Sequence, residues 1–151
     1  MQKEKNERMD KMSFEKINNN NLDKIHNRKC IMLVNFNKKE LSLIKNVSNF
    51  AGIRDHIILS DKNGENIIRD ILDGNISNEC ENGIKSKSVI FNNTPSTQVN
   101  AFLEGLKKVR INRPFTAMVT ETSIDWTLNN LIENLVQERN AMSLGKTIEH
   151  K

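Results

Sequence analysis

Residues 116–139, TAMVTETSIDWTLNNLIENLVQER, decide the fold class of this chain. They combine a short apolar run, a polar turn that holds the only Trp, and an apolar pattern at helical spacing. The apolar run begins at Phe115, directly after Pro114, and reaches Val119, which predicts a strand buried on both faces as in a parallel sheet. The apolar positions that follow mark one face of a helix: Leu128, Leu131, Ile132, Leu135 and Val136. The stretch therefore predicts a strand, a turn and a helix that packs against the strand.

The turn between this strand and helix carries helix-capping residues. Thr122 with Asp125 three residues later resembles a capping box, in which each side chain bonds a backbone amide near the helix start. The carboxylate of Asp125 would also interact favourably with the positive end of the helix dipole. We therefore expect the helix to begin at this turn.

The chain upstream repeats the same alternation. Strands are expected at residues 31–36, 57–59 and 89–91, each followed by a helical pattern. Asn37 with Glu40 predicts a capping box, Gly52 a helix end, and Thr94-Pro95 a cap before a proline at the first helical position. Gly105 inside a helix predicts close packing. The fold class is α/β, with a four-stranded, mostly parallel sheet flanked by helices. With the strands numbered along the chain (31–36, 57–59, 89–91 and 115–119), we prefer a parallel sheet in the order 2-1-3-4. A symmetric alternative pairs strands 1 and 3 antiparallel.

The two halves of the chain align with each other. Residues 60–72 match 120–132 at a constant offset, and residues 31–35 match 88–92. The matched segments have the same order of strand and helix, which predicts a tandem βαβα repeat that arose by duplication. The repeats span residues 30–74 and 88–139, and a linker without clear periodicity, residues 75–87, joins them.

Charge and composition separate the tails from the body. Residues 1–29 hold eight Lys/Arg and five Asp/Glu, whereas residues 30–139 hold thirteen of each. The basic excess therefore lies in the tails, and a nucleic-acid partner is not favoured. The low-complexity composition of residues 1–29 predicts a disordered polar tail, or an arm that orders on a partner. Residues 140–151 are expected to form a frayed C-terminal tail.

The composition indicates a soluble protein. The chain has 151 residues, of which 36% are hydrophobic, and no apolar run approaches a membrane span. The N-terminus lacks the apolar core of a secretory signal. Cys30 and Cys80 are the only cysteines and form no CxxC motif, which fits a reducing cytoplasm. The abundance of Asn, Lys and Ile is typical of an AT-rich genome.

The second half resembles the DUF3783 family of bacterial proteins, whose function is unassigned. The resemblance is carried by the strand at residues 89–92, the pair Arg113-Pro114, the run at 116–122, then Trp126, Leu128 and the helix at 131–139. The first half has Ser60-Asp61-Lys62 and Asn66 at the corresponding places, so it would be a degenerate copy. The resemblance implies an α/β domain of bacterial origin and brings no activity, cofactor or catalytic residue.

Polar side chains follow every expected strand, and these are the ligand-binding candidates. If the sheet is parallel, the strand ends converge on one edge, where ligands of α/β proteins bind. The candidates are Asn35, Asp61, Asn92, Thr120, Glu121, Asp125 and Trp126. The alternative is that these groups only cap helices and close turns, because every strand–helix turn needs such partners.

Other chemistry has weaker support in the sequence. Lys107, Lys108, Arg110 and Arg113 form a basic cluster that would bind phosphate, although a solvated helix C-terminus favours the same charges. The three His residues have no ligand spacing, so we expect no metal, and the Gly-rich phosphate loops are absent, so we expect no nucleotide cofactor. Glu121 and Asp125 are the only candidate acid/base pair, and no nucleophile context is recognisable.

Three functions follow from these observations. The first is a noncatalytic module that binds an unknown protein or small effector, as a monomer or a homodimer. The second is a small enzyme with its site at Thr120–Trp126. The third is a weak phosphate or nucleic-acid binder that uses Lys107–Arg113. We expect the first, because no catalytic constellation accompanies the fold.

Overall fold

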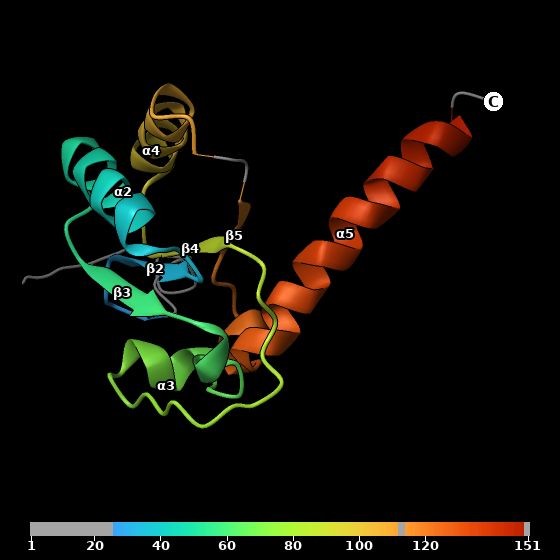
Figure 1. Ribbon diagram of the computed structural model, residues 1–151, viewed down its shortest axis with the longest axis horizontal. Helices are drawn as coiled ribbons and strands as arrows, with labels where there is room; N and C mark the ends of the chain where they lie inside the picture. Colours follow the sequence, from blue (N-terminus) through green and yellow to red (C-terminus); the bar gives the residue numbers. More distant parts are fainter. Residues whose placement is uncertain (1–25, 112–113, 150–151) are drawn as a thin grey trace, which may run out of the picture.

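Four strands form one mixed sheet in the order β3-β2-β4-β5 in the computed structural model, which describes residues 26–111 and 114–149 (Figure 1). The outer pairs β2–β3 and β4–β5 are parallel, whereas the central pair β2–β4 is antiparallel. This order confirms the prediction that the first and third strands of the chain are central and the second and fourth are outer. The wholly parallel version is wrong, and the symmetric alternative with an antiparallel central pair is correct. The strands are β2 (Cys30–Val34), β3 (His56–Leu59), β4 (Ser88–Asn92) and β5 (Phe115–Met118).

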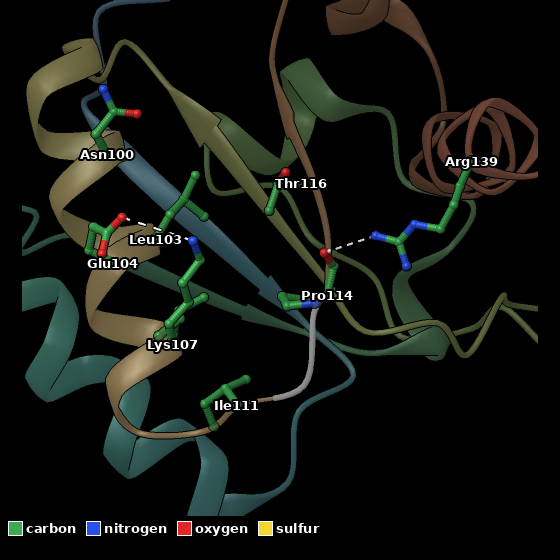
Figure 2. Close-up of a pocket in the computed structure, with 9 residues that line it drawn as sticks. Asn100, Leu103, Glu104, Lys107, Ile111, Pro114, Thr116 and Arg139 are labelled. Atoms are coloured by element: carbon green, nitrogen blue, oxygen red, sulfur yellow. Dashed lines mark hydrogen bonds and ion pairs between the residues drawn. The ribbon is translucent and has the colours of Figure 1, made fainter. Parts of the chain in front are cut away.

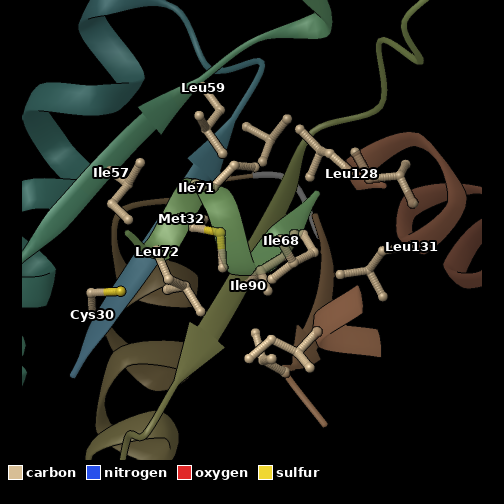
Figure 3. Packing of buried hydrophobic residues seen from close by; sticks show 14 residues of the cluster. Cys30, Met32, Ile57, Leu59, Ile68, Ile71, Leu72, Ile90, Leu128 and Leu131 are labelled. Carbon is tan, nitrogen blue, oxygen red and sulfur yellow. The ribbon is translucent and has the colours of Figure 1, made fainter. Parts of the chain in front are cut away.

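The two central strands are buried on both faces, and their side chains alternate between two separate hydrophobic cores. Cys30 and Met32 point to one side of the sheet, where Figure 3 shows them packed with Ile68, Ile71 and Leu128. The side chains between them point to the other side, where they pack against the two long helices α2 and α4. The sheet therefore separates a layer made of α2 and α4 from a layer made of α3 and α5.

The first layer contains α2 (Lys38–Ala51) and α4 (Ser96–Lys108). The predicted capping box of α2 is confirmed: Asn37 Oδ1 accepts from the amide of Glu40 at 2.8 Å, and Glu40 Oε1 accepts from the amide of Asn37 at 3.0 Å. The helix ends at Gly52, whose φ of 95° suits glycine. The cap predicted at Thr94 is wrong, because Pro95 itself is the extended cap residue and α4 begins one residue later.

The second layer contains two short 3₁₀ turns, η2 (Asp61–Asn63) and η3 (Ser123–Asp125), with α3 (Ile68–Leu72) and α5 (Leu128–Glu149). The capping box predicted for Thr122 and Asp125 is wrong, because Thr122 makes no side-chain cap bond. Thr127 caps α5 instead, its hydroxyl accepting from the amide of Asn130 at 3.1 Å. The helix also continues to Glu149, beyond residue 140, where a frayed tail is expected.

β5 departs from the expected buried strand. Its side chains alternate between half-buried and exposed, and Met118 is 45% exposed. β5 lies at the edge of the sheet, and α4 covers the sheet beside it without covering β5. The apolar run that predicted a doubly buried strand belongs to a strand that is covered on one face only.

The two halves meet through a reciprocal exchange of backbone hydrogen bonds. The amide of Ile68 donates to the carbonyl of Trp126 at 2.9 Å, and the amide of Leu128 donates to the carbonyl of Asn66 at 2.8 Å. Ile67 and Thr127 form the antiparallel bridge between them. These pairs have the same offset of sixty residues that aligns the two halves of the sequence. The common ancestry of the halves remains a prediction.

Residues 75–87 and residues 26–29 are both bonded to the body. Residues 75–87 contain no helix or strand, but Asn63 and Asn35 donate side-chain hydrogen bonds to their backbone. Residues 26–29, which the sequence assigned to the polar tail, lie against the sheet, while residues 1–25 fall outside the described residues. Residues 26–29 are therefore part of the described body and not of a separate tail.

Candidate functional site

The antiparallel central pair places the strand ends on two opposite edges of the sheet. The ends of β2 and β3, with Asn35 and Asp61, lie at one edge, and those of β4 and β5, with Asn92 and Thr120, lie at the other. A single ligand site at a common edge, as expected for a parallel sheet, is therefore not formed. Each set has to be judged separately.

The turn at Thr120–Trp126 is closed by its own side chains. The Thr120 hydroxyl accepts from the amide of Ser123 at 3.0 Å, and the Ser123 hydroxyl accepts from the amide of Thr120 at 2.9 Å. Asp125 accepts from Arg69 Nε at 3.0 Å, with both side chains exposed, and Glu121 is exposed beside it. Trp126 is half-buried against the core that contains α3 and α5. Neither the Glu121 carboxylate nor the Trp126 indole makes a described side-chain polar contact.

The asparagines at the strand ends are bonded to backbone. The Asn35 amide donates to the carbonyls of Ile84 and Ser86 at 2.9 and 3.0 Å. The Asn92 amide, which is buried, donates to the carbonyl of Arg28 at 2.6 Å. Both asparagines therefore stabilise the segments that lead into neighbouring strands, and their side-chain N–H groups donate to backbone carbonyls of the protein itself.

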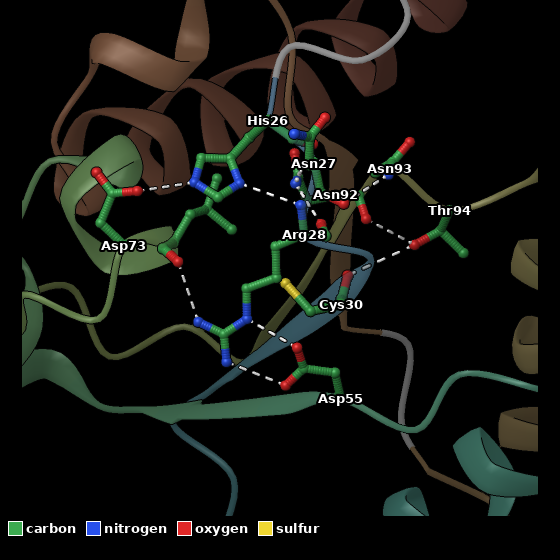
Figure 4. A network of polar contacts seen from close by, with 10 residues as sticks. His26, Asn27, Arg28, Cys30, Asp55, Asp73, Asn92, Asn93 and Thr94 are labelled. Atoms are coloured by element: carbon green, nitrogen blue, oxygen red, sulfur yellow. Dashed lines mark hydrogen bonds and ion pairs between the residues drawn. The ribbon is translucent and has the colours of Figure 1, made fainter. Parts of the chain in front are cut away.

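The N-terminal segment forms a polar clamp at the edge that carries Asn92 (Figure 4). The Arg28 guanidinium binds the Asp55 carboxylate through two nitrogens, at 2.7 and 3.0 Å, and donates to the carbonyl of Leu72 at 3.1 Å. The hydrogen bond from Arg28 holds the pKa of Asp55 below its ordinary value. His26 Nε2 lies 2.9 Å from the Asp73 carboxylate. Burial raises the pKa of the neighbouring Cys30 thiol to about 11, so this thiol stays protonated.

A second polar contact that sequence reasoning missed joins α2 to β3. His56 Nε2 lies 2.9 Å from the hydroxyl of Ser48, which is fully buried and also donates to the carbonyl of Ile53. Desolvation lowers the pKa of His56, which favours the neutral form of the ring in the folded protein. Because water and substrate cannot reach the Ser48 hydroxyl, the pair fixes the end of α2 and is no nucleophile–base couple.

The two helical layers carry opposite charge, which the neutral total conceals. Residues 36–54 and 94–111, which form the α2/α4 layer, hold seven Lys/Arg and two Glu, a net charge of +5. Residues 60–87 and 120–142, most of which lie on the other side of the sheet, hold five Lys/Arg and ten Asp/Glu, a net charge of −5. Lys107, Lys108 and Arg110 are exposed at the end of α4, while Arg113 lies outside the described residues.

The α2/α4 layer also exposes one large aromatic side chain. Phe50 of α2 is 95% exposed. It lies six residues after the buried Ile44, about 120° around the helix from the core-facing side. Phe50 borders a shallow cleft of about 250 Å³ between α2 and α4. Val47 lines it on α2, Ala101 and Gly105 line it on α4, and Lys108 lies at its border.

Gly105 sets the width of this cleft. A Cβ atom on Gly105 would lie 2.5 Å from Cγ1 of Val47, so glycine allows the two helices to approach closely. The close packing that the sequence predicted for Gly105 is thus confirmed. Phe50 and Gly105 together produce an apolar strip on the positively charged layer.

Comparison with known proteins bears on the second half of the chain. The model of one family matches residues 87–142. Its description is "Domain of unknown function (DUF3783)". No curated protein and no solved structure matches this chain. The predicted resemblance to this family is confirmed for the second half.

The segment that the DUF3783 model matches covers β4, α4, β5, η3 and the first part of α5. It contains Thr120, Trp126 and Gly105, whereas Phe50 and the N-terminal clamp lie in the first half. No helix in the described part of the chain has the length and apolar character needed to cross a bilayer. Among the same residues, no group of three or more His, Cys, Asp or Glu side chains could hold a metal ion.

Proposed function

We propose that this protein is a noncatalytic binding module, and that its α2/α4 layer docks an acidic, amphipathic segment of a partner protein. The observation that carries the proposal is Phe50, an aromatic side chain 95% exposed beside an apolar cleft. Exposed aromatic residues at such places are typical anchors of protein interfaces. The net charge of +5 on this layer favours a partner segment rich in Asp and Glu.

The form of the cleft favours a helix as the docked segment. It runs along the seam between α2 and α4, where the close approach at Gly105 leaves a groove instead of a ridge. An amphipathic helix presents apolar residues at intervals of three and four, which fit a groove between two helices. Phe50 would pack against the apolar stripe of the helix, and the lysines of the layer would lie beside its acidic flanks.

The two other functions have less support. At Thr120–Trp126, the hydroxyls bond the turn itself and Asp125 is paired with Arg69, which favours a structural role over catalysis. The exposed cations Lys107, Lys108 and Arg110 would also attract nucleic acid. However, phosphate contacts do not require an exposed phenyl ring beside an apolar groove, so we favour the protein partner.

A synthetic peptide tests the proposal directly. The probe is a fluorescein-labelled helix of about 18 residues (roughly five turns) with Leu on one face and Glu elsewhere; the comparison peptide has Lys in place of every Glu. Fluorescence anisotropy should show binding of the acidic peptide only, and Phe50→Ala should weaken it about tenfold without changing the melting temperature. Ile76→Ala is the matched control, because Ile76 is 41% exposed in the negatively charged layer.

Two outcomes would contradict the proposal. Equal binding by Phe50→Ala and the wild-type protein would show that the exposed ring is not an anchor. Tighter binding of a DNA duplex than of the acidic peptide, with a steep dependence on salt, would favour the nucleic-acid function. Light scattering of wild-type and Phe50→Ala protein should accompany the titration, since loss of self-association in the variant would identify a second copy as the partner.

A further inference from the structure

We infer that a separate cavity between α4 and β5 binds a small carboxylate with an apolar body. The cavity has a volume of about 430 Å³, within the range of pockets that accept small organic ligands. It lies at the outer edge of the α2/α4 side of the sheet (Figure 2). This site is distinct from the Phe50 cleft and shares none of its lining residues.

The cavity results from the position of β5 in the sheet. Thr116 is opposite Val89 in the strand register, and Val89 belongs to the core under α2 and α4. The Thr116 side chain therefore lies on the α4 face, but α4 packs against α2 and leaves β5 uncovered. Leu103 and Ile111 line the cavity on the side of the helix and the chain that follows it. The space is thus apolar on one side and bounded by an exposed hydroxyl on the other.

A fixed guanidinium lies at the opposite wall. Arg139 Nη2 donates to the carbonyl of Pro114 at 3.2 Å, and the guanidinium carbon lies 3.8 Å from the centre of the Phe115 ring. These two contacts orient the side chain, and in the described part of the chain Pro114 is the one acceptor found for it. A guanidinium has five N–H donors, so several remain to bind a ligand.

The remaining charges in the cavity select a single negative group. Lys107 Nζ lies 3.9 Å from the Glu104 carboxylate, so this cation already has a counter-charge. Glu104 would repel a ligand with several negative charges. A guanidinium pairs most strongly with a planar carboxylate through two parallel hydrogen bonds. Leu103 and Ile111 require an apolar group next to that carboxylate.

Two sources supply this chemistry, a free organic acid and the C-terminal residue of a peptide. Octanoate represents the first and N-acetyl-leucine the second; octanol, with the same chain and no charge, is the control ligand. Isothermal titration calorimetry should show binding of at least one of the two acids and no comparable binding of octanol. Whichever acid binds more tightly identifies the source, and either result supports the site.

Variants of the protein locate the binding. Arg139→Gln should weaken binding of the acid at least tenfold, whereas Arg69→Gln, which removes an exposed arginine that does not line the cavity, should not. Thr116→Phe keeps Arg139 and fills the cavity, so it should also abolish binding of the acid. This variant tests the site independently if Arg139→Gln fails to fold. Phe50→Ala should leave binding of the acid unchanged, which separates this site from the proposed partner surface.

The inference is overturned by any of three results. The first is that neither acid binds. The second is that octanol binds as tightly as octanoate, which would indicate an apolar hollow without charge recognition. The third is that both Arg139→Gln and Thr116→Phe retain wild-type affinity. Failure of the acidic peptide to bind the α2/α4 layer would not affect these measurements.

Discussion

Replacement of Gly105 by Ala tests the close approach of α2 and α4. In an exposed helix interior this change would stabilise the protein by about 1 kcal/mol, because glycine is the poorer helix former. Here the new methyl group would lie 2.5 Å from Cγ1 of Val47. Val47 is β-branched and has few alternative rotamers, so overpacking of this kind costs about 1–3 kcal/mol. We expect a net destabilisation of about 1 kcal/mol.

The second variant, Val47→Ala, removes the atom that the new methyl group meets. In this background Gly105→Ala should gain the helix-propensity term without the clash, and stabilise the protein by about 1 kcal/mol. The two effects of the same substitution differ by about 2 kcal/mol, which is the coupling free energy of the cycle.

Urea denaturation measures all four proteins of this cycle. Trp126 is the only tryptophan and is half-buried in the core of the opposite layer, so its emission follows unfolding without being changed by either substitution. If Gly105→Ala stabilised the wild-type and the Val47→Ala protein equally, the coupling would be zero. The two helices would then be free to move apart, and the reasoning that links Gly105 to the width of the cleft would be refuted.

Three further predictions concern the polar contacts. The lowered pKa of His56 means that the unfolded chain takes up a proton that the folded protein does not, so stability falls as the pH drops below about 6.5. His56→Gln should therefore reduce the loss of melting temperature between pH 7 and pH 5. Arg28→Met should lower the melting temperature at pH 7, because Arg28 stabilises the ionised Asp55 carboxylate and lowers its pKa. The difference in melting temperature between wild type and variant should shrink in acid, since the ion pair is lost as Asp55 becomes protonated. Glu121→Gln should leave thermal unfolding unchanged, because the side chain is exposed; a clear shift would reveal an interaction at this turn.

The sequence predicted most of the secondary structure because its local signals are strong. The capping box at Asn37, the helix end at Gly52 and the apolar patterns of the helices depend on neighbouring residues alone. The direction of the central strand pair does not, because linker residues 75–87 can lead into either a parallel or an antiparallel strand. Periodicity also could not show that β5 is an edge strand, since burial on its second face depends on whether a helix covers it.

The candidate sites were harder to predict for the same reason. The polar strand ends of Asn35 and Asn92 were correctly located, but the antiparallel pair separates them and turns each into a structural donor. Phe50 lies three residues after Val47, a spacing that is typical of one helix face, but it points away from the core. The opposite charges of the two layers cancel in any count along the chain, and they become visible only when the sheet separates the segments.

The reciprocal bonds between residues 66–68 and 126–128 have a consequence for assembly. Each half contributes one open edge of its strand pair to the centre of the sheet, so neither half is complete without the other. Residues 75–87 act as a tether that makes the association of the two halves intramolecular. Proteolytic cleavage within this tether would convert a unimolecular fold into a bimolecular complex, whose stability would then depend on the concentration of the fragments.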